Sequence, residues 1–142
     1  MKENLNVLDE LNKGATMGMD AINFVLDKVE DEELKKTLEL EYNKYKDISR
    51  RANEIYSKYS DKEPHETNTM NKIMTWYGVQ MKTLTDQSNS KIAELLLQGT
   101  NMGIIEGRKL LNNKEADKEI KDLLSEFVTM QEDSVEKLKT FL

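Results

Sequence analysis

Hydrophobic residues recur every three or four positions along almost the whole chain, the spacing that places them on one face of an α-helix. The first segment shows this alternation without a miss, at Leu8, Leu11, Ala15, Gly18, Ile22, Val25 and Val29. After the acidic run EDEE, a second segment has the same kind of face, at Leu34, Leu38, Glu41, Tyr45, Ile48, Ala52, Ile55 and Tyr59. The two faces predict a helical hairpin over residues 3–59.

A connecting segment is predicted over residues 60–87. It opens with SDKEPHETN, which contains the only proline and the only histidine. Proline lacks a backbone donor and clashes with a preceding helical turn, so a loop is expected there, with His65 solvated rather than catalytic. A helix should follow, with an apolar stripe at Met70, Ile73, Tyr77, Met81 and Leu84. The run TDQSNS over residues 85–90 is rich in residues that prefer helix caps, which predicts a break.

A second hairpin is predicted over residues 88–142. The face of its first helix contains Ile92, Leu96, Thr100, Gly103, Gly107 and Leu110. Asn112 or Asn113 is expected as the C-terminal cap of that helix. The last helix is expected over residues 116–142, with a face at Ile120, Leu124, Phe127, Gln131, Ser134, Leu138 and Phe141.

A short repeat relates the two hairpins. The pattern Gly-x-x-Met-Gly occurs at residues 14–18 and again at 99–103, and superimposing residues 5–30 on 90–115 also matches several leucine positions. The chain is therefore predicted to be one all-α domain over residues 1–142. Its expected form is a four-helix bundle of two pseudo-repeated hairpins with an additional connecting helix.

Five glycines lie on the predicted bundle-facing sides of the helices, at Gly14, Gly18, Gly99, Gly103 and Gly107. Each glycine in a helix costs about 0.8–1 kcal/mol relative to alanine, so some other contact must offset them. The favoured interpretation is helix contact, with Gly18 and Gly103 touching across the bundle and Gly107 tolerating alanine better than Gly103. The other interpretation is space for a planar cofactor or for an inserted aromatic side chain, with Trp76 and Tyr77 as candidates.

Composition narrows the functional classes. The net charge is −6 with both signs intermixed, which gives no basic surface for nucleic acid or anionic lipid. No uncharged apolar run approaches membrane length, so a cytoplasmic protein without nucleic-acid or membrane partners is expected. The chain has no cysteine and one histidine, which removes the usual pairs of nucleophile and base. An enzyme is therefore less expected than a non-enzymatic protein.

Two hairpins joined by a long crossover, with carboxylates on inner faces, resemble the ferritin-like superfamily, particularly its small bacterial members without di-iron motifs. The resemblance covers most of the chain and implies a four-helix bundle. Active di-iron proteins of this kind use Glu on two helices and Glu-x-x-His on the other two. Here Glu39 is followed three residues later by Tyr42, and Glu126 by Thr129, so both histidines are missing.

A degenerate carboxylate site for iron or manganese remains the alternative. Its candidate ligands are Glu41 and Glu106, helped by Asp20 and Gln131. Glu41 is the only charge on a predicted face, and a simpler explanation is a buried hydrogen bond to Tyr45, Gln131 or a lysine. In a bundle with a crossover, the two glutamates would lie about 10–15 Å apart along the axis, whereas an up-down-up-down bundle would bring them level.

The leading functional hypothesis is a non-enzymatic helical bundle without a cofactor that acts through protein contacts, with a homodimer as one form. Five tyrosines, at 42, 45, 56, 59 and 77, exceed what one narrow core needs, and tyrosine is enriched at interfaces. The alternative hypothesis is a ferritin-like metal-binding or oxidoreductase protein.

Overall fold

A computed structural model describes residues 2–60 and 68–142, with side chains for residues 3–60 and 75–142. Secondary structure in these residues is entirely helical. The helices are α1 (Lys2–Leu26), α2 (Glu32–Tyr59), α3 (Asn68–Lys82), α4 (Asn89–Asn113) and α5 (Lys118–Lys139). The all-α prediction is confirmed. The expected loop with Pro64 and His65 lies almost entirely outside the described residues.

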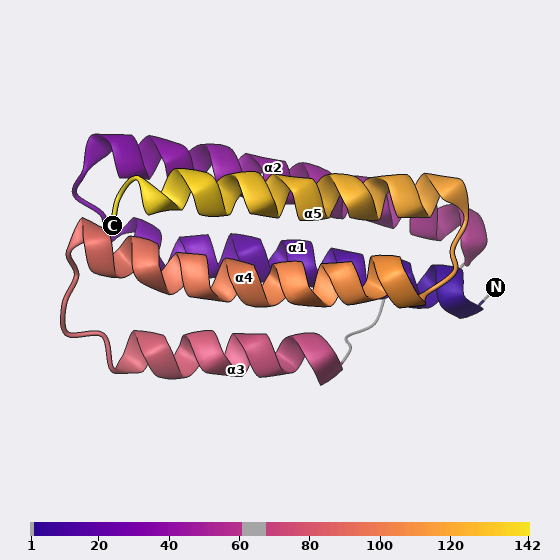
Figure 1. The fold of residues 1–142 in the computed structure, drawn as a ribbon, viewed down its shortest axis with the longest axis horizontal. Coiled ribbons are helices and arrows are strands. Elements are labelled where there is room, and N and C mark those ends of the chain that lie inside the picture. Colours follow the sequence, from indigo (N-terminus) through magenta and orange to yellow (C-terminus); the bar gives the residue numbers. More distant parts are fainter. Residues whose placement is uncertain (1, 61–67) are drawn as a thin grey trace.

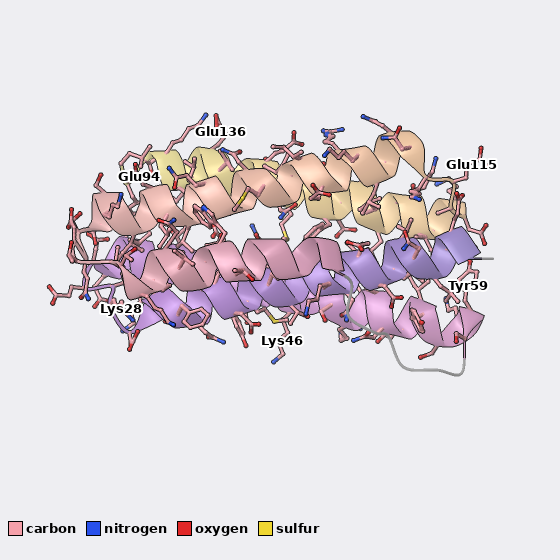
Figure 2. The ribbon with its side chains drawn as sticks, turned by 90° about the horizontal axis from the view of Figure 1, so that it is seen from below. Lys28, Lys46, Tyr59, Glu94, Glu115 and Glu136 are labelled. Carbon is pink, nitrogen blue, oxygen red and sulfur yellow. The ribbon has the colours of Figure 1, made fainter. Side chains whose placement is uncertain are left out.

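Two antiparallel helix pairs, α1 with α2 and α4 with α5, lie side by side (Figure 1). Helix α3 runs back along the length of the molecule on the outside and contacts α1 and α4. Because α3 returns the chain to the end where α2 begins, α2 and α4 run in the same direction. Seen from the side of α3, acidic and basic side chains are spread over the surface, from Lys28 and Glu94 at one end to Tyr59 and Glu115 at the other (Figure 2).

Local sequence signals explain where the helices begin. Asp31 caps α2, since its Oδ1 accepts a hydrogen bond from the Leu34 backbone N–H at 2.8 Å. Ser88 caps α4 by accepting from the Lys91 N–H at 3.2 Å. The run TDQSNS thus separates α3 from α4, as predicted.

Two predicted boundaries are wrong. Helix α4 ends at Asn113 and its cap is Lys114 in an extended conformation, with φ −110° and ψ 140°, rather than an asparagine. The chain leaves the helix directly into the next connection, so no left-handed residue is needed. Helix α5 covers Lys118–Lys139 rather than 116–142 because Asp117 already has the extended conformation of an N-cap.

The predicted faces form the core. Every predicted face position in α5 up to Leu138 is buried, and in α2 only Tyr59 among the predicted positions is not fully buried. The largest fully buried side chains include Phe127, Leu8, Leu11, Leu34 and Leu38, which come from three helices. A core of Leu, Ile, Val and Ala buried to this extent supplies the main driving force for folding.

Candidate functional site

Six polar side chains meet inside this apolar core. We call this group the polar strip; its members are Glu41, Tyr45, Tyr77, Thr100, Gln131 and Ser134. They come from α2, α3, α4 and α5, and all six are buried. A buried polar group is costly unless it is hydrogen-bonded, so such a cluster is the first place to look for function.

The glycines create the space that the two tyrosines of the strip occupy. A Cβ atom added at Gly18 would lie 2.6 Å from the Tyr45 ring, and one added at Gly99 would overlap the Tyr77 hydroxyl. Tyr45 also packs edge-on against Phe127, with ring centroids 6.1 Å apart. The missing side chains therefore allow two large aromatic rings to enter the core.

The other two glycines on α4 face α5. A Cβ at Gly103 would lie 2.5 Å from Gln131 Nε2, and one at Gly107 would lie 2.6 Å from Val128 Cγ2. That Gly18 and Gly103 touch stays a prediction; the structure places a side chain beside each of them, Tyr45 beside Gly18 and Gln131 beside Gly103. Of the two interpretations, the inserted aromatic side chain describes Tyr77 against Gly99. Gly14 is buried and, together with Gly18, Gly99 and Gly103, lines a small cavity of about 20 Å³.

Two hydroxyl groups of the strip donate to one backbone carbonyl oxygen of α4. The Thr100 hydroxyl donates to the Leu96 carbonyl oxygen at 2.7 Å, and the Tyr77 hydroxyl donates to the same oxygen at 3.5 Å. Burial and then the Glu41 carboxylate raise the pKa of Tyr45 to about 12, although Gln131 and Thr100 oppose the shift. Burial also raises the pKa of Tyr77. Both phenols are therefore neutral near pH 7.

Glu41 is the ionisable group of the strip that responds near neutral pH. Its side chain lies in the interior, and the residue is 8% exposed. Burial raises its pKa to about 7, while the nearby Ser134 hydroxyl and the charge of Lys44 act in the opposite direction. Ser134 Oγ and Gln131 Oε1 are also buried, and neither atom forms a hydrogen bond of good geometry with a described residue. The strip thus has unused hydrogen-bonding capacity beside a carboxyl group that can ionise.

A surface groove between α2 and α5 leads to this carboxyl group. Its larger part, of about 630 Å³, has Ile48, Leu40 and Met130 among its lining residues. Its smaller part, which we call the Glu41 pocket, has a volume of about 310 Å³. The residues that line this pocket are Thr37, Leu40, Glu41, Lys44, Tyr45, Met130, Asp133, Ser134 and Lys137. The two parts share Leu40, Lys44, Met130 and Asp133 and so form one continuous depression.

The residues proposed for a metal site are not brought together. Glu106 lies 3.7 Å from Lys109 on its own helix, in an ion pair. Glu41 comes nine residues after the start of α2 and Glu106 seventeen after the start of α4, which separates them by about 12 Å along parallel helices. In the part of the chain that the structure describes, no three His, Cys, Asp or Glu residues are grouped closely enough to hold a metal ion.

Sequence reasoning missed several buried polar residues of α1. Asn4, Asp9 and Glu10 are almost fully buried. Asn4 Oδ1 accepts a hydrogen bond from the Asp117 backbone N–H at 2.9 Å, which joins the start of α1 to the start of α5. Asn4 continues the line of Leu8 and Leu11 at the start of the helix, whereas Asp9 and Glu10 lie off the predicted apolar face. Asp9 lies near Tyr56 of α2, a neighbour that the periodicity of α1 does not specify.

The five tyrosines, whose number suggested an interface, are mostly used inside the fold. Tyr45, Tyr56 and Tyr77 are buried in the core, and Tyr42 and Tyr59 are partly buried. The Tyr59 hydroxyl donates to Asp117 Oδ2 at 2.6 Å and so ties α2 to the start of α5. The tyrosines therefore stabilise the fold, and any interface must be sought elsewhere.

No family model, curated protein or solved structure matches this chain. None of the helices in the described residues combines the length and apolar character needed to cross a membrane. The functional assignment therefore depends on the geometry of the groove and the polar strip.

Proposed function

We propose that this protein acts through protein contacts and that the groove between α2 and α5 is its contact surface, occupied by a second copy of the chain. The observation behind this proposal is Leu40, which is 63% exposed and lines both parts of the groove. A large apolar side chain beside an apolar depression is typical of interaction sites. Helices α2 and α5, which line the groove, lie on the side of the molecule away from α3 (Figure 1).

Charge complementarity favours a second copy as the occupant. Lys44 on α2 and Asp133 on α5 both line the groove. Neither forms an ion pair within the described part of the chain. In a twofold dimer the same surface is used by both subunits, so Lys44 of one copy can meet Asp133 of the other, twice. Such pairs set the register of an interface more than its affinity.

Light scattering over a concentration series tests this proposal. The wild-type chain should show a rising average mass, and Leu40→Glu should remain monomeric because it places a charge in the apolar contact. Val79→Glu is the matched control, since Val79 is 54% exposed but lies on α3. Lys44→Asp and Asp133→Lys should each weaken the dimer, and the double exchange should restore it.

A wild-type chain that is monomeric at every concentration would refute the dimer. Equal weakening by the Leu40 and Val79 variants would also refute it, because the effect would then not depend on the groove.

The fold itself belongs, in this proposal, to the ferritin-like type, with two copies of one hairpin and a crossover helix. Its support is the parallel course of α2 and α4 and the repeated glycine pattern. The chain would then be a member of that group that uses its groove instead of a di-iron centre.

A further inference from the structure

The Glu41 pocket contains a buried carboxyl group but no cationic hydrogen-bond donor paired with it. When Glu41 is ionised, no cation forms an ion pair with it among the described residues, and Lys44 acts on it only through longer-range attraction. Ser134 also lines the pocket and is 6% exposed, and its Oγ atom forms no hydrogen bond of good geometry with a described residue. Glu41 and Ser134 both line this pocket, and the Ser134 hydroxyl is near enough to Glu41 to lower the pKa of its carboxyl group, but no cationic donor lies between them among the described residues.

We propose that the Glu41 pocket binds a primary ammonium group, which donates hydrogen bonds to the Glu41 carboxylate and to Ser134 Oγ. An ammonium ion has three N–H donors and one positive charge, so it satisfies both groups and compensates the buried charge. Charge-assisted hydrogen bonds of this kind are stronger than neutral ones.

Other ligand classes fit less well. A ligand carboxylate would place a second negative charge beside Glu41, which is unfavourable unless one of the two is protonated. A metal ion would require more oxygen or nitrogen ligands than the pocket offers, since the grouped ligands needed are absent from the described residues. The ammonium group needs only the two partners that are present.

The other residues of the pocket indicate what kind of group carries the ammonium ion. Leu40 and Met130 offer apolar contact for a short alkyl stem. A volume of about 310 Å³ accommodates such a stem together with the ammonium group. Lys44 and Lys137 also line the pocket against the one further carboxylate of Asp133, so the remaining charge repels a second positive group. The pocket should therefore prefer a monoamine to a diamine of equal length.

Binding should be coupled to proton release. Below about pH 7 the Glu41 carboxyl group is largely protonated, and binding of the ammonium ion transfers that proton to the buffer. The other charged or titratable groups near Glu41 are Lys44 and Tyr45 from α2, Asp133 and Lys137 from α5 and Tyr77 from α3. If the ammonium ion binds only the ionised form of Glu41, its affinity should be about tenfold higher at about pH 8 than at about pH 6.

The experiment is a titration of the full chain with n-butylammonium chloride, followed by NMR of the Glu side-chain carboxyl carbons and by calorimetry in two buffers. It is performed at a protein concentration where light scattering detects only monomer, so that its outcome is independent of the proposed dimer. We expect a saturable shift of the Glu41 signal, a lower Glu41 pKa in the complex, and proton release near pH 6.5. Tetramethylammonium chloride, which has no N–H donor, should produce none of these changes.

Variants separate the site from non-specific attraction. Glu41→Gln should lose proton release and bind about 10–100-fold more weakly, because it keeps the shape but removes the charge. Ser134→Ala should weaken binding several-fold. Glu39→Gln is the matched control, because Glu39 is an exposed carboxylate on the same helix that lines neither part of the groove, and it should change the affinity little. Circular dichroism of each variant establishes that it is folded.

A second titration, with N-acetyl-lysine amide, distinguishes the source of the ammonium group. Tighter binding of this compound would indicate a lysine side chain of a protein, and tighter binding of n-butylammonium would indicate a free amine. No saturable binding of either compound, or equal binding by wild type and Glu41→Gln, would overturn the proposal.

Discussion

Adding one methyl group at Gly99 should destabilise the protein, although the same substitution usually stabilises a helix. Alanine is favoured over glycine within a helix by about 1 kcal/mol. At Gly99, however, the new methyl group would overlap the hydroxyl and ring of Tyr77, which is buried between α3 and α4. Overpacking of this kind costs about 1–3 kcal/mol. Because the overlap with Tyr77 is severe, we expect the upper part of this range, about 2–3 kcal/mol, and so a net loss of about 1–2 kcal/mol for Gly99→Ala.

The assay is thermal unfolding followed by circular dichroism. A domain of this size changes its melting temperature by about 2–4 °C per kcal/mol, so Gly99→Ala should lower it by about 2–8 °C. Gly78→Ala is the matched control, because Gly78 is also helical and a Cβ there would meet nothing within 4 Å. That variant should raise the melting temperature by up to about 4 °C.

A double-mutant cycle makes the test specific to the contact. The atom nearest to the added methyl group is the Tyr77 hydroxyl oxygen, which Tyr77→Phe removes. The cost of Gly99→Ala should therefore fall by at least about 0.5 kcal/mol in the Tyr77→Phe background. If Gly99→Ala stabilised the protein as much as Gly78→Ala, or if its cost were the same with and without the Tyr77 hydroxyl, the explanation of the glycines given above would be wrong.

Three further predictions concern the other glycines, the buried carboxyl group and the metal content. Gly107→Ala should cost more stability than Gly103→Ala, which reverses the order expected from the sequence. The reason is that Gly107 faces the stiff, buried side chain of Val128, whereas Gly103 faces the end of the flexible Gln131 side chain. Urea unfolding of both variants measures the difference. Glu41 binds a proton more tightly in the folded state than in the unfolded state. Its contribution to the free energy of unfolding should therefore fall by about 3 kcal/mol as the pH rises from 4.5 to about 7. In urea unfolding from pH 4.5 to 8, Glu41→Gln should lack that loss and be more stable than wild type at pH 8; parallel pH profiles would contradict the buried carboxyl group. Elemental analysis of protein purified without chelator or metal-affinity tag should find no stoichiometric metal, and iron or manganese that disappears in Glu41→Ala or Glu106→Ala would instead establish the metal site.

The helices and their buried faces could be predicted from the sequence because both depend on local spacing. The alternation that ends at Leu138 in α5 is a property of one helix, and so is the cap at Ser88. Even the burial of Glu41 followed from its position on an otherwise apolar face. These features require no knowledge of the neighbouring helices.

The content of the polar strip could not be predicted in the same way. Which side chain fills the gap beside a glycine depends on the relative height and rotation of two helices. Tyr45 reaches Gly18 and Tyr77 reaches Gly99 only because α2 and α3 lie at particular heights beside α1 and α4. Periodicity within a helix gives neither quantity. The groove was missed for the same reason, since it arises from the spacing between α2 and α5.

The course of the chain also has a consequence for the order of folding. The most extensive helix contacts lie within each hairpin, between helices that are adjacent in sequence. Contacts of this kind form quickly, because closing a short loop costs little entropy. Helix α3 rests on α1 and α4, which belong to different hairpins. Its docking site exists only after the two hairpins have associated, so the burial of Tyr77 against Gly99 marks the completion of the bundle rather than its nucleation.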